Sequence, residues 1–76
     1  MKEIGVRDFK KLIHEDKTTC RVVELDNEFY GIYRYGKGVY VIFQGSDTPI
    51  NSLSNKIKEQ LLEKLKNGEY KLDKSF

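Results

Sequence analysis

The sequence predicts a small α+β domain in which a three-stranded antiparallel meander packs against two helices. Three observations lead to this fold class. β-Branched and aromatic runs alternate with short turn signals in the middle of the chain. Leucine and isoleucine recur every four residues near the C-terminus. The length, 76 residues, suits one domain over residues 1–76. The expected element order is (β)α-βββ-α.

The first helix is expected within residues 6–17, "VRDFKKLIHEDK". Phe9, Leu12 and Ile13 fall at i, i+3 and i+4, the spacing of one helix face. Asp8 can cap the first turn or lie favourably at its positive end. Residues 2–6, "KEIGV", are the candidate for a short strand before this helix.

Three strands are expected next, over residues 20–25 ("CRVVEL"), 28–35 ("EFYGIYRY") and 39–44 ("VYVIFQ"). The residues between them, Asp-Asn and Gly-Lys-Gly, tolerate the positive φ that tight hairpin turns require. Residues 45–49, "GSDTP", are read as turn and loop. The pattern therefore predicts an antiparallel meander.

The second helix is expected from about residue 53 to 67. Leu53, Ile57, Leu61 and Leu65 form its apolar stripe, which Leu62 widens. Ser52 or Ser54 can cap its start, and residues 67–68, Asn-Gly, are a natural stop. For the tail, residues 69–76, the sequence leaves two alternatives open: a fourth short strand or an ordered arm.

Strict alternation along the strands predicts two different sheet faces. With two-residue loops at residues 27–28 and 36–37, one face matches what the two helices would cover: Val23, Leu25, Tyr30, Ile32, Val39, Val41 and Phe43. The opposite face then carries Val22, Phe29, Tyr33, Tyr35, Tyr40 and Ile42. A three-residue loop over residues 36–38 would slip the third strand and mix the two sets.

The second face is the candidate functional site. Residues 29–43 hold four of the five tyrosines and two of the four phenylalanines. One interpretation is that tyrosine is a good strand former whose ring packs across the strands. The other is a recognition surface, because Tyr and Arg supply the anchors of many interfaces. Its expected partner-binding residues are Phe29, Tyr33, Tyr35 and Tyr40, with Arg21 and Arg34 near the ends of the face.

Composition favours a protein partner over nucleic acid. The chain has 14 Lys and Arg against 12 Asp and Glu, and each half, residues 1–38 and 39–76, carries a net charge of +1. A basic block typical of non-specific nucleic-acid binders is therefore missing. A homodimer is compatible with the sequence.

The expected location is the cytoplasm. No apolar run approaches the ~20 residues of a membrane span, and the start lacks a signal-peptide pattern. The single cysteine, Cys20, is expected to be a buried thiol in a reducing compartment.

The residues do not predict an enzyme, a metal site or a cofactor. His14 is the single histidine, and a Cys20–His14 pair would have no third residue to orient it. Cys/His pairs at zinc spacing are absent from the sequence. Glu24, Asp26 and Glu28 cluster at the expected tip of the first hairpin, either as a solvated turn or as an attraction for a cation or a basic partner.

Three resemblances bear on function. "MKEIGVRDFKKLI" resembles the start of Phd/YefM-type antitoxins, which implies a DNA-binding dimer. The α-βββ-α order is similar to double-stranded-RNA-binding domains, although "SLSNKIKEQ" lacks the basic cluster with which those domains contact phosphates. The whole layout is similar to small phage-encoded inhibitors of the anti-CRISPR kind, which implies stoichiometric blocking of a host protein. The leading expectation is such an inhibitor, and the alternative is a DNA-binding regulator of the Phd/YefM type.

Overall fold

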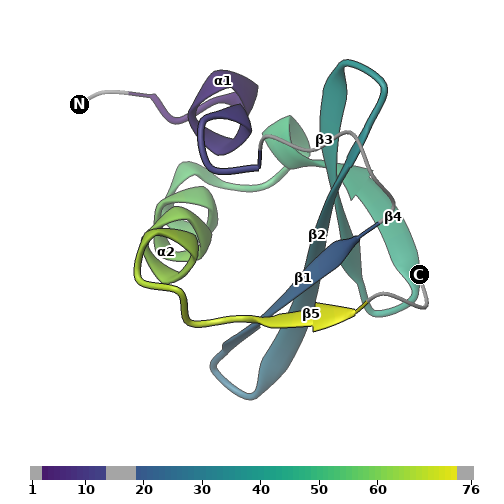
Figure 1. Ribbon diagram of the computed structural model, residues 1–76, viewed down its shortest axis with the longest axis vertical. Coiled ribbons are helices and arrows are strands. Elements are labelled where there is room, and N and C mark those ends of the chain that lie inside the picture. The colour runs from purple at the N-terminus through teal and green to yellow at the C-terminus, as the bar shows by residue number, and fades with distance from the viewer. Residues whose placement is uncertain (1–2, 14–18, 74–76) are drawn as a thin grey trace.

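The computed structural model describes residues 3–13 and 19–73. They form an α+β fold in which two helices lie against a five-stranded antiparallel sheet, with strand order β4-β3-β2-β1-β5 (Figure 1). The elements in chain order are α1 (Val6–Lys10), β1 (Cys20–Leu25), β2 (Glu28–Tyr35), β3 (Gly38–Phe43), β4 (Ser46–Pro49), the 3-10 turn η1 (Ile50–Ser52), α2 (Asn55–Lys66) and β5 (Lys71–Asp73). The α+β class, the two helices and the central meander are confirmed, but the sheet is larger than the three strands expected.

The strand β4 lies within residues 45–49, which were expected to form a turn and loop. Gln44, which was expected to end the third strand, and Gly45 have positive φ, 52° and 80°, and reverse the chain in a two-residue hairpin. Ser46 then pairs with Phe43, and Pro49 pairs with Tyr40. Because β4 is an edge strand, a proline without an N–H is tolerated there.

The strand β5 settles the two alternatives for the tail. Lys71–Asp73 pair antiparallel with β1, with Asp73 opposite Cys20 and Lys71 opposite Val22. The tail is therefore a strand over these three residues, and residues 74–76 lie outside the described part of the chain.

The hairpin loops fix the register of the meander. Asp26 and Asn27 have φ of 50° and 67° and form the first loop, one residue earlier than residues 27–28. This displacement moves every partner by two positions and therefore leaves each side chain on its predicted face. Tyr35 pairs with Gly38, so the second loop has two residues and the three-residue alternative is wrong.

The face predicted for helix packing is confirmed. Five of its seven side chains are buried and the other two, Leu25 and Phe43, pack partly buried against the same cluster. Tyr30 stacks on Phe43, with ring centroids 4.6 Å apart. The helices, η1 and the chain just after α1 complete a single hydrophobic core with Phe9, Ile13, Ile50, Leu61, Leu62 and Leu65.

The chain before α1 is irregular, so the short strand expected at residues 2–6 is wrong over residues 3–5, and Val6 begins the helix. The backbone of Ile4 bonds to α2 instead: its N–H donates to Asn55 Oδ1 at 2.9 Å, and its carbonyl accepts from Lys58 Nζ. Asp8 Oδ2 accepts from the Gly5 N–H at 3.0 Å and caps the helix start as expected. The helix ends at Lys10, and residues 14–17 of the expected span lie outside the described residues.

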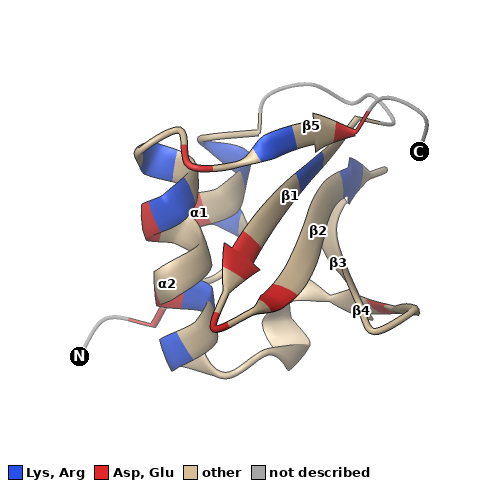
Figure 2. Ribbon diagram, turned by 90° about the horizontal axis from the view of Figure 1, so that it is seen from below, with Lys and Arg blue, Asp and Glu red and all other residues tan. Residues whose placement is uncertain are grey.

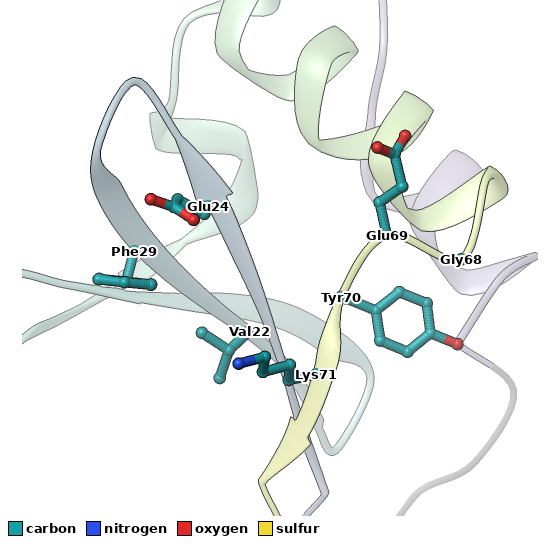
Figure 3. A pocket seen from close by; sticks show the side chains of 7 residues that line it. All are labelled: Val22, Glu24, Phe29, Gly68, Glu69, Tyr70 and Lys71. Carbon is teal, nitrogen blue, oxygen red and sulfur yellow. The ribbon is translucent and has the colours of Figure 1, made fainter.

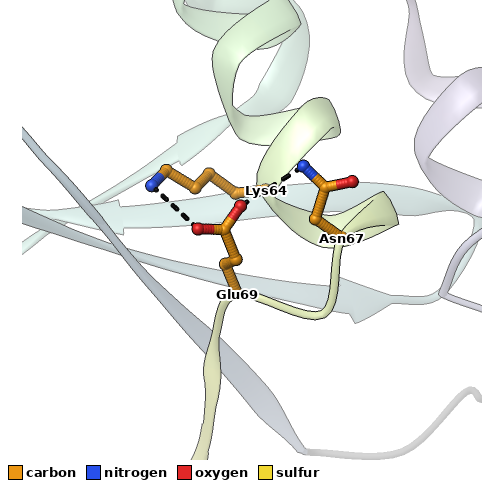
Figure 4. A network of polar contacts seen from close by, with 3 residues as sticks. All are labelled: Lys64, Asn67 and Glu69. Carbon is orange, nitrogen blue, oxygen red and sulfur yellow. Dashed lines mark hydrogen bonds and ion pairs between the residues drawn. The ribbon is translucent and has the colours of Figure 1, made fainter.

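The helix α2 has the caps that its sequence predicts. Of the two candidate serines, Ser54 is the N-cap, and its Oγ accepts from the Ile57 N–H at 3.3 Å. At the other end, Gly68 has φ of 73° and the Glu69 N–H donates to the Lys64 carbonyl at 2.9 Å, the pattern of a Schellman cap. The Glu69 carboxylate accepts from Asn67 Nδ2 and pairs with Lys64 Nζ at 3.5 Å (Figure 4). Within residues 3–13 and 19–73, no helix has both the length and the apolar character needed to cross a membrane.

Candidate binding face

The sheet has one face turned away from both helices, which we call the open face. Figure 1 shows α1 and α2 together on one side of the sheet. The strand pairings assign to the opposite side a set of residues from all five strands: Cys20, Val22, Glu24, Phe29, Gly31, Tyr33, Tyr35, Gly38, Tyr40, Ile42, Asp47, Pro49, Lys71 and Asp73. The aromatic set predicted for this face is thereby confirmed in its position.

Two aromatic side chains of the open face are strongly exposed. Tyr35 is 72% exposed and Phe29 is 61% exposed. Leu72 is also exposed, at 52%, but it pairs with Arg21 and therefore lies on the helix side of the sheet. Because the register fixes the direction of each strand residue, Phe29 and Tyr35 cannot turn into the core.

Three tyrosines and an aspartate line a hollow of about 370 Å³ on this face, which we call the tyrosine hollow. The rings of Tyr33 and Tyr40 are stacked, with centroids 5.8 Å apart, and the Tyr35 ring lies at 75° to that of Tyr40. The Tyr33 hydroxyl donates to Asp47 Oδ2 at 3.1 Å. The three tyrosines therefore lie together as predicted.

Tyr33 departs from the expectation of a solvent-facing ring, because it is only 8% exposed. Its ring packs against Tyr40 while its hydroxyl is held by Asp47. Burial raises the pKa of Tyr33, and the hydrogen bond and negative charge of Asp47 raise it further. The hydroxyl is thus held in its protonated, donating form.

A second hollow, of about 220 Å³, lies over Gly31 in the middle of the face. A Cβ on Gly31 would lie 2.7 Å from Cys20 Sγ, so the thiol occupies the space that a side chain would need. Cys20 is buried as expected, and burial, followed by the charge of Asp73, raises its pKa to about 11. A thiol this hard to ionise is a poor nucleophile.

A third hollow, of about 460 Å³, lies at the β1–β2 hairpin (Figure 3). It is lined by Val22, Glu24, Phe29, Gly68, Glu69, Tyr70 and Lys71. Phe29 and Val22 also line the hollow over Gly31, so these two hollows adjoin.

The two arginines do not border the open face, and their predicted placement at its ends is wrong. Arg21 pairs with the core residue Ile32, and its guanidinium lies over the Tyr70 ring, 5.6 Å from the centroid. Arg34 donates from Nη1 to the Ile13 carbonyl at 3.1 Å. Each arginine lies two positions from a core residue of its own strand, and the period of two places it on the helix side.

The fold separates charges that are evenly mixed along the sequence (Figure 2). Among the described residues, the open face with its turns and rim carries five acidic side chains against two basic ones: Glu24, Asp26, Asp47, Glu69 and Asp73 against Lys37 and Lys71. Residues 3–13 and 50–68, on the helix side, carry seven basic and four acidic ones. The half-chain charges of +1 gave no sign of this, because sheet and helix segments occur in both halves.

The described residues contain no group of three or more His, Cys, Asp or Glu arranged to hold a metal ion. His14 lies outside the described part of the chain. Asp26 and Glu28 take their predicted places at the hairpin tip. Asp26 and Glu24 extend the acidic rim of the open face, whereas Glu28 pairs with Leu25 and lies on the helix side.

Comparisons with known proteins add no relative. No protein-family model matches the chain, and neither a curated protein nor a solved structure matches it. The likeness to anti-CRISPR-type inhibitors and to Phd/YefM antitoxins therefore stays an expectation from the sequence.

Proposed function

We propose that the protein is a non-enzymatic binding module that blocks a protein partner by covering it stoichiometrically with its open face. The exposure of Phe29 and Tyr35 on a face turned away from both helices carries this proposal. Aromatic side chains beside hollows are typical interface anchors, because they bury much area at low entropic cost.

The charge of the open face favours a partner with a basic surface. Five acidic side chains lie on the open face and its rim, and complementary potentials accelerate and orient docking. A second copy of the chain is disfavoured on this face, because two such acidic rims would repel each other. The resemblance to small phage-encoded inhibitors that the sequence suggests makes a bacterial defence protein the first partner class to test.

A DNA-binding regulator is the second candidate, and the excess of basic residues on the helix side favours it. Arg7, Lys10 and Lys11 lie on or next to α1, and Lys64 and Lys66 lie in the last turn of α2. Binding by phosphate neutralisation would weaken steeply with salt. We expect no shift of random duplex DNA at moderate salt, since Asp8, Glu59 and Glu63 interrupt the basic residues. A clean, salt-sensitive shift at low micromolar protein would favour the regulator.

Affinity capture with matched variants tests the binding module. Three tagged proteins are used in parallel to capture partners from bacterial lysate: the parent, an open-face double variant (Phe29→Ala with Tyr35→Ala) and an α2 double variant (Glu59→Ala with Gln60→Ala). The second pair lies exposed on α2. A protein held by the parent and the α2 variant, but lost by the open-face variant, supports the proposal when it forms a stoichiometric complex on purification. A partner held equally by all three chains would refute it.

A further inference from the structure

We infer that the tyrosine hollow binds a cationic side chain, lysine or arginine, that the protein partner presents. The inference rests on the proposed function, because it names the chemistry of one contact within the open face. It is carried by three aromatic rings and one carboxylate that converge on a single hollow.

The ring arrangement suits a cation. The face of an aromatic ring carries partial negative charge and attracts an ammonium or guanidinium within about 6 Å of its centroid. Tyr35 and Tyr40 lie at 75° with centroids 6.5 Å apart, so they form two sides of a corner. Tyr33 lies nearly parallel to Tyr40, at 24°, and is the buried member of the set.

The carboxylate of Asp47 supplies a full negative charge beside the rings. Its Oδ2 accepts from the Tyr33 hydroxyl, which holds the carboxylate in place. Among the described residues Oδ1 accepts no hydrogen bond and Asp47 has no basic partner, although its side chain is exposed. A cation that enters the hollow therefore gains an ion pair in addition to its contacts with the ring faces.

The other two hollows lack this combination. The hollow at the β1–β2 hairpin also has rings and carboxylates, but its Tyr70 ring is already faced by the Arg21 guanidinium and its Glu69 is paired with Lys64. Its remaining carboxylate, Glu24, shares the hollow with the positive charge of Lys71. The hollow over Gly31 has Phe29 as its one aromatic ring, together with Val22 and Ile42, and suits an apolar group. The tyrosine hollow is thus the site on the open face whose chemistry selects a cation.

Nuclear magnetic resonance titration with two matched peptides tests the inference at about 0.15 M salt, where longer-range attraction is screened. The probes are acetyl-Gly-Gly-Arg-Gly-Gly-amide and the same peptide with norleucine in place of arginine. The arginine peptide is expected to shift the amide signals of Tyr33, Tyr35, Tyr40 and Asp47, and the norleucine peptide to leave them in place.

Variants separate the contributions of ring and charge. Asp47→Asn and Tyr35→Leu are each expected to weaken binding by about two- to fivefold, the range for exposed ion pairs and cation–π contacts. Tyr35→Phe keeps the ring and should bind as the parent does. Asp26→Asn removes the same charge from the hairpin tip and should leave the affinity unchanged.

Three outcomes would overturn the inference: no shift at the highest soluble concentration of the arginine peptide, equal weakening by Asp26→Asn and Asp47→Asn, or equal binding of the norleucine peptide. The last would leave the proposed function intact, since an apolar anchor would then fill the hollow. Conversely, arginine binding that depends on Asp47, in a protein whose captured partner ignores Phe29 and Tyr35, would show that the hollow binds a cation, but it would refute both the proposed function and the claim that the partner supplies that cation.

Discussion

Gly31→Ala is expected to destabilise the protein, because the new methyl group would collide with a buried thiol. The added Cβ would lie 2.7 Å from Cys20 Sγ, while its next neighbour, the Ile42 Cβ, lies at an ordinary 3.6 Å. Cys20 is buried but borders the hollow over Gly31, so the sulfur can avoid the methyl group only by leaving its present rotamer. Overpacking of this kind costs about 1–3 kcal/mol.

A second mutation, Cys20→Ala, makes this prediction specific. Once the sulfur is removed, Gly31→Ala should stabilise the protein instead of destabilising it. Replacing a glycine within a strand stabilises by about 0.5–1 kcal/mol when the conformation and the space allow it. Gly31→Ala should therefore destabilise the parent by about 1 kcal/mol or more, yet stabilise the Cys20→Ala variant by about 0.5 kcal/mol. In a domain this small, 1 kcal/mol corresponds to about 4–8 °C in Tm.

Thermal and urea unfolding of the four proteins in this double-mutant cycle provide the measurement. Opposite signs in the two backgrounds would confirm that Cys20 lies over Gly31. An equal loss of stability in both backgrounds would refute the contact and, with it, the β1–β2 register that places Val22 opposite Gly31.

Three further changes have defined outcomes. Folding raises the pKa of Cys20 from 9.0 to about 11, so the unfolded chain releases the thiol proton first and the free energy of unfolding should fall by up to about 2 kcal/mol between these two pH values. In urea unfolding, a Cys20→Ala variant should lose less stability over the same pH range. An equal loss would exclude the thiol as the cause. Gly68→Ala should lower the free energy of unfolding by about 1 kcal/mol in urea, because alanine is strained at a φ of 73°. The methyl group would meet no other atom, so the whole loss would come from the backbone of the cap. An unchanged midpoint would contradict the cap. Asn55→Ala should cost about 1 kcal/mol and accelerate amide exchange at Ile4, whose N–H it would leave without its acceptor; unchanged exchange at Ile4 would show that the bond does not hold this segment.

The sequence predicts the elements whose signals are local and periodic. The meander, the apolar stripe of α2 from Ile57 to Leu65, a serine cap and the Asn67–Gly68 end all follow from residue types at fixed spacing. The sequence left Ser52 and Ser54 open as the cap, and Leu53, expected in the stripe, precedes the helix. The predicted sheet faces are correct although the first loop lies one residue earlier than expected. That displacement changes each pairing partner by two positions, and residues two apart on a strand point to the same face. The same rule, applied to Arg21 and Arg34, would have placed both on the helix side.

The parts that sequence reasoning missed depend on tertiary contacts. Residues 46–49, Ser-Asp-Thr-Pro, have poor strand propensity, and β4 forms because the turn at Gln44 and Gly45 brings them alongside β3. The burial of Tyr33 depends on its stack with Tyr40 and on Asp47, a residue of that unpredicted strand. The tyrosine hollow could therefore not be predicted from the sequence, because Asp47 belongs to the unexpected strand β4.

Hydroxyl-radical footprinting of the protein, free and bound to its captured partner, tests the central claim most directly. Phe29 and Tyr35, on the open face, and Leu72, on the helix side of the sheet, are all exposed in the free protein and provide three comparable probes. If the open face binds the partner, complex formation should strongly reduce oxidation of Phe29 and Tyr35 and leave Leu72 unchanged. Protection of Leu72 with unaltered oxidation of Phe29 and Tyr35 would contradict it and place the interface on the helix side.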